Sequence, residues 1–169
     1  RALLALASLP EAMRKRARFL VIGQDNPQAF LRQARKLGID EQLTIEKGRT
    51  DIPDILQAAD LMIHPAYMES GGLVLIEAII AGLPVVATSV CGFAHYIEDA
   101  DAGLVIGEPF DQEGLNAAVS RALLDRACRA AWSLSGVAFG QTNDQLFEMP
   151  ANALAVITEY SDRRRASSA

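Results

Sequence analysis

The sequence is poor in cysteine and in positive charge, and each shortage excludes a class of protein. Only Cys91 and Cys128 occur among 169 residues, without CxxC or Cys/His spacing, so we expect neither a disulfide framework nor a zinc site. Sixteen Lys and Arg against 21 Asp and Glu give a net charge of −5. Broad nucleic-acid binding is therefore not expected, because no excess positive charge is available to neutralise phosphates. The expected compartment is the cytoplasm.

Long hydrophobic runs are also missing. None approaches the roughly 18 to 20 residues of a membrane span, because Glu77, Gly82 and Pro84 interrupt the best candidate, and no signal peptide is visible. Half of the residues are nevertheless hydrophobic, which is enough for a substantial core in a single domain. The sequence begins with Arg1 rather than Met, so we expect further sequence upstream.

Short β-branched runs alternate with segments of helical periodicity, which is typical of βαβ units and a parallel sheet. We therefore predict an α/β fold with a Rossmann-like doubly wound parallel sheet and extra helices at the C-terminal end. The predicted strands are 18–23, 43–48, 60–65, 84–88 and 103–107. The predicted helices are 27–37, 52–59, 71–81, about 93–99, 111–126, 127–138 and 150–160, followed by a polar tail.

Ligands of open parallel sheets bind where strands end and helices begin, because unpaired N–H groups and helix dipoles converge there. Four segments occupy such positions in the predicted fold, namely "GQDNP", "GRTDIP", "HPAYMESGG" and "TSVCGFAHY". The third segment opens an otherwise apolar run that contains two carboxylates, Glu69 and Glu77.

If 71–81 is a helix, Gly71 and Gly72 form its first turn and let a phosphate approach the backbone amides. Glu69 precedes this turn, and Glu77 lies roughly 9 to 12 Å away at about 1.5 Å per residue. A nucleotide diphosphate sugar matches this layout, with a hydroxyl-bearing group for each carboxylate and an anionic centre. Taken singly, Glu69 could instead serve the helix dipole, and Glu77 could be a buried acid bonded to an amide.

The stretch "ESGGLVLIEAIIAGLPVVA" resembles the E-x7-E signature of the retaining family 4 glycosyltransferases, in the donor-binding domain of their GT-B fold. The resemblance extends to about residue 126. It implies that Glu69 is the catalytic-site acid that contacts the transferred sugar, that amides around Gly72 and Leu73 contact the phosphate or sugar, and that Glu77 contacts the ribose. It also implies that residues 1–169 are the donor domain and that an N-terminal acceptor domain lies upstream.

The segment "VCGFAHYIEDADAG" narrows the resemblance, because His95 stands where most members carry an acid. Together with "HPAYMES" and "GQDNP", this variant is similar to the lipopolysaccharide core glucosyltransferase I subgroup. The implied reaction is retaining transfer of glucose from UDP-glucose to an inner-core heptose, without a metal ion or cofactor. A UDP-sugar epimerase of the same fold and a non-catalytic nucleotide-binding module are the alternatives. The contact made by His95 stays open.

Gly23 and Arg49 are further candidates for donor binding. Gly23 opens the loop "GQDNP", where Asn26 could cap the next helix; the loop is not GxGxxG, which gives little support to a dinucleotide-dependent dehydrogenase. Arg49 could hold the nucleotide base or be solvated, and Thr50 or Asp51 is more readily interpreted as a helix cap.

The remaining reactive or charged residues carry weaker signals. His64 is interpreted as a hydrogen-bonded structural histidine, and Cys91 as structural because it lacks a nucleophile-elbow pattern. The basic run 14–18 is typical of a solvated helix end, and peripheral association of the full-length protein with the inner membrane stays open. The resemblance places an Arg and Lys phosphate clamp upstream of Arg1, so we expect weak donor binding and no transfer by this chain alone.

Overall fold

Parallel strands form two separate ladders in the computed structural model, which describes residues 1–143. Strand β1 (Phe19–Ile22) pairs with β2 (Leu43–Glu46). Strand β4 (Val85–Thr88) lies between β3 (Met62–His64) and β5 (Gly103–Ile106). Each strand falls inside its predicted range, so the predicted strands and their parallel direction are confirmed.

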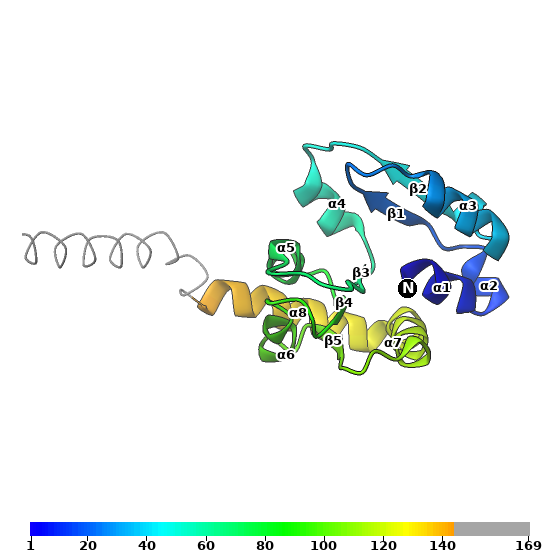
Figure 1. Cartoon of the computed structure of the whole chain (residues 1–169). Coiled ribbons are helices and arrows are strands. Elements are labelled where there is room, and N and C mark those ends of the chain that lie inside the picture. Colours follow the sequence, from blue (N-terminus) through cyan, green and yellow to red (C-terminus); the bar gives the residue numbers. More distant parts are fainter. Residues whose placement is uncertain (144–169) are drawn as a thin grey trace, which may run out of the picture.

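The helices also follow the predicted order (Figure 1). The predicted ones are α3 (Gln28–Leu37), α4 (Ile52–Ala58), α5 (Leu73–Ile80), α6 (His95–Asp99), α7 (Gln112–Leu124) and α8 (Arg126–Thr142). The sequence analysis missed α1 (Ala2–Ser8), α2 (Glu11–Arg14) and the short 3₁₀ turn η1 (Asp40–Gln42). The predicted helix at 150–160 and the polar tail lie outside the described residues.

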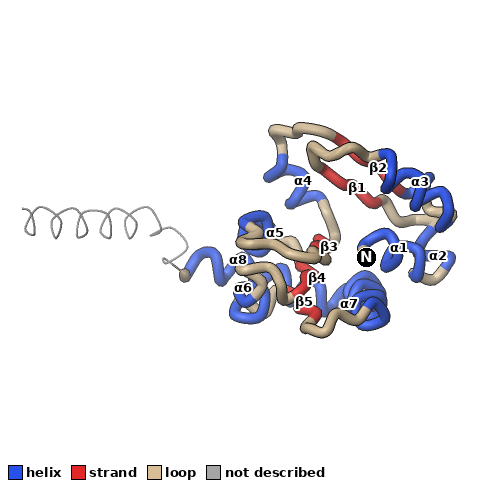
Figure 2. The backbone as a smooth tube through the Cα atoms, in the orientation of Figure 1, coloured by secondary structure: helices blue, strands red, loops and turns tan. Residues whose placement is uncertain are grey.

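The prediction of one continuous sheet needs correction, because β1–β2 and β3–β4–β5 are not hydrogen-bonded to each other. Figure 2 shows the strands as two groups. One face of both ladders nevertheless contributes to a shared core. Phe19 and Val21 of β1 and Ile63 of β3 pack against the same buried cluster as Val86 of β4. The two ladders are therefore joined by side-chain packing rather than by strand pairing.

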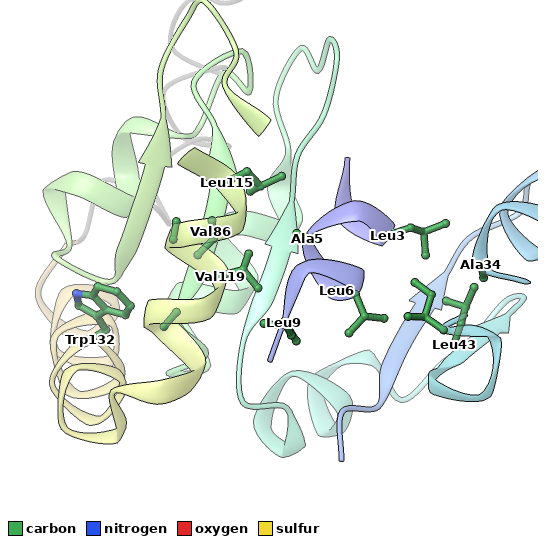
Figure 3. Packing of buried hydrophobic residues seen from close by; sticks show 13 residues of the cluster. Leu3, Ala5, Leu6, Leu9, Ala34, Leu43, Val86, Leu115, Val119 and Trp132 are labelled. Atoms are coloured by element: carbon green, nitrogen blue, oxygen red, sulfur yellow. The ribbon is translucent and has the colours of Figure 1, made fainter. Parts of the chain in front are cut away.

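Helix α1 lies at the centre of this shared core. Leu3, Leu6 and Leu9 are nearly fully buried, and α1 packs against both α3 and α7. Figure 3 shows the side chains of Leu3 and Leu6 directed toward the Ala34 and Leu43 side, with α7 on the other side of α1. The burial of these leucines makes α1 an internal element of the fold.

The opposite face of β3–β4–β5 carries a second core. Val85 and Ala87 of β4 pack there with Leu75 and Ile79 of α5 and Ile97 of α6. The three-stranded ladder is thus covered by helices on both faces, as a doubly wound sheet requires. The corresponding face of β1 is more open, and Leu20 there is 37% exposed.

Helix α8 crosses α5 at very short range, and Gly136 makes this approach possible. A Cβ atom at Gly136 would lie 2.6 Å from the carbonyl oxygen of Ile79 in α5. That oxygen belongs to the backbone, so a flexible side chain cannot move away to relieve the contact. The absence of a side chain at residue 136 therefore sets the distance between α8 and α5.

We predict that Gly136→Ala destabilises the protein by about 1 to 3 kcal/mol, the usual range for overpacking. This loss should outweigh the gain of up to about 1 kcal/mol that Ala normally brings to a helix interior. Urea unfolding followed by circular dichroism measures the difference. The matched control is Gly107→Ala, because a Cβ there meets nothing within 4 Å. A Gly136→Ala variant at least as stable as the parent would contradict this account of the α5–α8 contact.

Candidate functional site

The loop 65–72 connects β3 to α5 and carries Glu69. It ends at Gly72, the N-cap of α5, whose φ of +90° lies in the left-handed region that residues with a side chain rarely adopt. The helix begins at Leu73. Gly71 and Gly72 therefore precede α5 and do not form its first turn, which corrects the prediction by two residues.

The loop and the beginning of α5 border an open cavity of about 530 Å³. Glu69, Gly71, Gly72 and Leu73, all singled out from the sequence, lie together on its wall. The full lining is His64, Glu69, Ser70, Gly71, Gly72, Leu73, Val74 and Phe93. The cavity thus brings a carboxylate, a pair of glycines and the N-terminus of an apolar helix into one place.

The polar groups of this cavity are only partly engaged by the protein. The Gly71 N–H donates to Glu69 Oε1 at 3.3 Å, and the Leu75 N–H donates to the Gly72 carbonyl at 2.9 Å. The N–H groups of Leu73 and Val74, in the first turn of α5, have no partner within the helix. Because a carboxylate can accept about four hydrogen bonds, Glu69 retains capacity for a ligand.

The segment after β4 makes backbone contacts with the loop 65–72. The Phe93 N–H donates to the Gly71 carbonyl at 3.0 Å, and Glu69 forms an isolated parallel bridge with Cys91. A Cβ at Gly92 would lie only 2.2 Å from the Ser70 carbonyl oxygen. The two segments "HPAYMESGG" and "TSVCGFAHY" are therefore in direct backbone contact.

Phe93 is a cavity residue that the sequence analysis did not single out. Its ring would lie 3.4 Å from a Cβ placed on Gly71, so it covers the backbone at the mouth of the loop. Phe93 belongs to the segment "TSVCGFAHY", and this position was the only sequence signal that could have pointed to it. An aromatic residue among apolar neighbours cannot be distinguished from a core residue by sequence alone. The ring adds an apolar side chain to the lining of the cavity.

Cys91 is buried beneath this loop, as the structural interpretation predicts. Burial raises the pKa of its thiol, so the thiol stays protonated at neutral pH. Its neighbour Thr88, which is fully buried, donates to the Ala66 carbonyl at 3.0 Å. Both side chains therefore belong to the support of the loop rather than to its reactive surface.

Glu77 is exposed on α5, about one turn beyond Leu73, and does not line the cavity. Among the described residues its carboxylate has no hydrogen-bond or ion-pair partner. The alternative of a buried acid bonded to an amide is therefore wrong. A ligand that contacts both carboxylates would have to extend from the cavity along the surface of α5.

Gly23 and Arg49 lie at the end of the other ladder and do not line the cavity. The Gly23 N–H donates to the Glu46 carbonyl at 3.1 Å and so extends the β1–β2 pairing. Arg49 forms ion pairs with Glu46, at 2.5 Å, and with both carboxylate oxygens of Asp51. These hydrogen bonds to Asp51 and Glu46 raise the pKa of Arg49 and lower that of Asp51.

The helix-cap interpretation of Asp51 is only half right. Asp51 occupies the N-cap position of α4, but its carboxylate binds Arg49 and makes no cap hydrogen bond. The predicted cap at Asn26 needs correction, because Pro27 is the N-cap of α3 and the helix has no side-chain cap hydrogen bond; Asn26 Oδ1 only accepts a local bond from the Gln28 N–H at 3.0 Å. Arg49 is thus exposed to solvent, as one of its two interpretations expects, and is held there by two carboxylates.

The two histidines differ in their surroundings. Nε2 of His64 is buried without a hydrogen-bond partner among the described residues, so the expected satisfied histidine is not observed. Leaving such a group unpaired costs about 1 to 3 kcal/mol, which a ligand or ordered water would offset. His95 Nδ1 lies 3.0 Å from the Gly92 carbonyl, and its ring packs on Tyr96. The open contact of His95 is therefore with its own turn and not with the cavity.

Residues 1–143 contain no group of three or more His, Cys, Asp or Glu side chains placed to hold a metal ion. In the same part of the chain, every helix is too short or too polar to cross a membrane.

Comparison with known proteins adds to this geometry. A family model described as "Glycosyl transferases group 1" matches residues 1–136. The lipopolysaccharide glucosyltransferase WaaG of Escherichia coli K12 is 47% identical over 158 residues, which are 94% of this chain and 42% of WaaG. A D-inositol 3-phosphate glycosyltransferase of Mycobacterium marinum is 36% identical over 154 residues, 85% of this chain and 32% of that protein. The chain thus spans less than half the length of these curated relatives.

The solved structures agree with these relatives. The crystal structure of WaaG, a glycosyltransferase involved in lipopolysaccharide biosynthesis, superposes with a TM-score of 0.90 at 46% identity. The match covers 93% of this chain and 42% of that one. The predicted fold class is confirmed, because the structural neighbours, WaaG included, are GT-B glycosyltransferases.

We predict that Gly92→Ala displaces the loop 65–72, because the new Cβ would meet the Ser70 carbonyl at 2.2 Å. Hydrogen exchange of the loop amides, followed by mass spectrometry, should become clearly faster than in the parent. Gly23→Ala is the control, since a Cβ there meets nothing within 4 Å. Unchanged exchange of the loop amides in Gly92→Ala would show that the contact between Gly92 and Ser70 does not hold the loop in place.

Proposed function

The chain belongs to the glycosyl transferases of group 1, and on that premise we propose that it is the donor-binding domain of a retaining lipopolysaccharide core glucosyltransferase. The donor is UDP-glucose and the acceptor is an inner-core heptose. The acceptor domain is contributed by sequence upstream of residue 1. The proposal keeps the cytoplasm as the compartment, with peripheral contact to the inner membrane through the full-length protein.

The cavity that joins Glu69 to the N-terminus of α5 is the observation that carries this proposal. A diphosphate placed against the amides of Gly72, Leu73 and Val74 would meet the positive end of the helix dipole. The glucose would then lie near Glu69, whose remaining lone pairs accept hydrogen bonds from sugar hydroxyls. Similarity to WaaG supports the same donor and acceptor classes.

The proposed chemistry follows from where charge develops. As the bond between the sugar and the diphosphate breaks, the sugar becomes oxocarbenium-like and negative charge grows on the leaving UDP. Preformed amides aimed at that charge stabilise it without reorganisation. The proposal assigns this task to backbone N–H groups of α5 and to the upstream basic clamp, with no metal ion or cofactor. Glu69 orients and stabilises the sugar and is not assigned a covalent bond.

Glu77 is assigned to the ribose. It lies about one turn, or roughly 6 Å along the helix axis, beyond Leu73. Its exposed carboxylate, free of partners among the described residues, is available for the paired hydroxyls of a ribose. A donor molecule would therefore extend from the cavity to the outer face of α5. Gly23 and Arg49 remain in the proposal only as contacts to the nucleotide end.

We predict different effects for the two carboxylates in calorimetric or ligand-observed NMR titrations. Glu69→Gln should weaken UDP-glucose but leave UDP nearly unchanged, whereas Glu77→Gln should weaken both. A hydrogen bond to a charged group contributes about 1.5 to 3 kcal/mol, so the losses should be roughly tenfold to a hundredfold. ADP-glucose should bind more weakly than UDP-glucose, which tests whether the uracil base is recognised. EDTA should leave the affinities for UDP and UDP-glucose unchanged, because no metal ion is assigned to the site. The exposed Glu41→Gln is the control; equal effects of all three variants would refute the assigned roles.

We also predict that the 169-residue chain alone transfers no glucose to an inner-core heptose acceptor. The proposal places the acceptor domain and the clamp upstream of this chain, so the chain alone should not bring the reacting groups together. Incubation with UDP-glucose and acceptor, with product analysis by mass spectrometry, provides the measurement. Glucosyl transfer by the chain alone would show that the proposed division of labour is wrong, and epimerised UDP-sugar would favour the epimerase alternative.

A further inference from the structure

Arg1 connects three separate parts of the molecule near the cavity. Its guanidinium carbon lies 4.0 Å from the ring centroid of Tyr67 and 3.6 Å from that of Phe110. Its Nη1 donates a hydrogen bond to the Ala66 carbonyl. Its own carbonyl accepts from Gln112 Nε2 at 3.3 Å. One side chain at the beginning of α1 therefore contacts the loop 65–72 and the segment between β5 and α7.

The Ala66 carbonyl accepts two hydrogen bonds, of which the bond from Arg1 is one. The same carbonyl accepts from Thr88 Oγ1 at 3.0 Å, and Thr88 is fully buried at the end of β4. Tyr67, the next residue, is 78% exposed, so little of its ring is packed on apolar neighbours. The guanidinium is thus a principal restraint on the first part of the loop. Three residues after Ala66 comes Glu69.

The second part of the loop is restrained independently. Its contacts come from Phe93 and Gly92, which hold Gly71 and Ser70. Loss of Arg1 should therefore loosen residues 66–69, where the bridge from Glu69 to Cys91 would be the remaining restraint on Glu69, and leave the amides at the beginning of α5 in place. This division separates the sugar end of the site from the phosphate end.

We infer that Arg1 is a positioning residue that, stacked between Tyr67 and Phe110, fixes the orientation of Glu69 toward the donor sugar. The inference rests on the proposed function of the cavity and adds a residue to it. Arginine suits this place because its planar guanidinium can stack on two rings while its N–H groups remain in the plane to donate. A loop already ordered before binding spares the entropy of ordering it at that moment.

The test compares Arg1→Ala, Arg1→Lys and the parent chain in titrations with UDP and with UDP-glucose. Arg1→Ala should lower the affinity for UDP-glucose about tenfold and the affinity for UDP less than about threefold. Arg1→Lys should recover part of the loss, since it keeps the charge and a donor but not the planar stack. Tyr67→Leu should weaken UDP-glucose as well, and the Arg1→Ala, Tyr67→Leu pair should be less than additive because the two side chains act together.

Arg129→Ala is the matched control for loss of stability. Arg129 is another partly buried arginine, which donates to the carbonyls of Ala122 and Leu123 far along the chain from the loop. It should lower the free energy of unfolding without changing the ratio of the two affinities. If Arg1→Ala leaves that ratio as it is in the parent, or if Arg129→Ala changes it equally, the inference is wrong.

A measurement without ligand separates this inference from the proposed function. Hydrogen exchange of amides 67–69 should become faster in Arg1→Ala than in Arg129→Ala, while exchange in α5 stays the same. If the parent binds neither UDP nor UDP-glucose, the proposed function of the chain alone fails, and the exchange experiment still decides whether Arg1 holds the loop. Equal exchange in the two variants would overturn the positioning role.

Discussion

The apolar packing of α1 is the interaction on which the rest of this structure depends. Ladders β1–β2 and β3–β4–β5 share no hydrogen bonds, so no strand pairing fixes one relative to the other. Leu3, Leu6 and Leu9 enter a core to which both ladders contribute. Fully burying a leucine stabilises the folded state by roughly 1.5 to 3 kcal/mol. The three leucines together therefore contribute substantially to holding the two ladders in place. The position of α1 also delivers Arg1 to the loop 65–72.

Close backbone contacts, made possible by glycine, give the site its shape. Gly92 lets the segment after β4 touch Ser70, and Gly72 adopts the left-handed conformation from which α5 starts. The loop is held at its beginning by bonds to the Ala66 carbonyl and near its end by the bond to the Gly71 carbonyl. A loop restrained at both ends keeps its carboxylate in place before any ligand arrives, which is the condition for electrostatic stabilisation without reorganisation.

The sequence predicted the regular elements well because their signals are local. The apolar strands, the helical periodicity and the bond from the Gln28 N–H to Asn26 all depend on a few adjacent residues. Helix α1 was missed because its burial by α3 and α7 depends on distant segments. The separation of the two ladders likewise depends on which strands become neighbours, and no local pattern encodes it.

The candidate site shows the same division. Spacing and glycine content identified Glu69, Gly71 and Gly72, and the structure brings them to one cavity. The start of α5 was misplaced because helical periodicity does not report the backbone angle of Gly72. The position of Phe93 in the cavity and the ion pairs of Arg49 could not be predicted. Each depends on where a side chain points once the loops at the ends of the strands are folded.

Electrostatics limits what this cavity can do by itself. Its lining includes the carboxylate of Glu69 but no Lys or Arg among the described residues, and Glu77 lies nearby. The dipole at the beginning of α5 is equivalent to only about half a positive charge, which is less than the charge of a diphosphate. Arg49 does not compensate, because it is paired with Glu46 and Asp51. Tight binding of a nucleotide diphosphate therefore requires positive charge in addition to the described lining of the cavity, which is the task that the proposal gives to the upstream clamp.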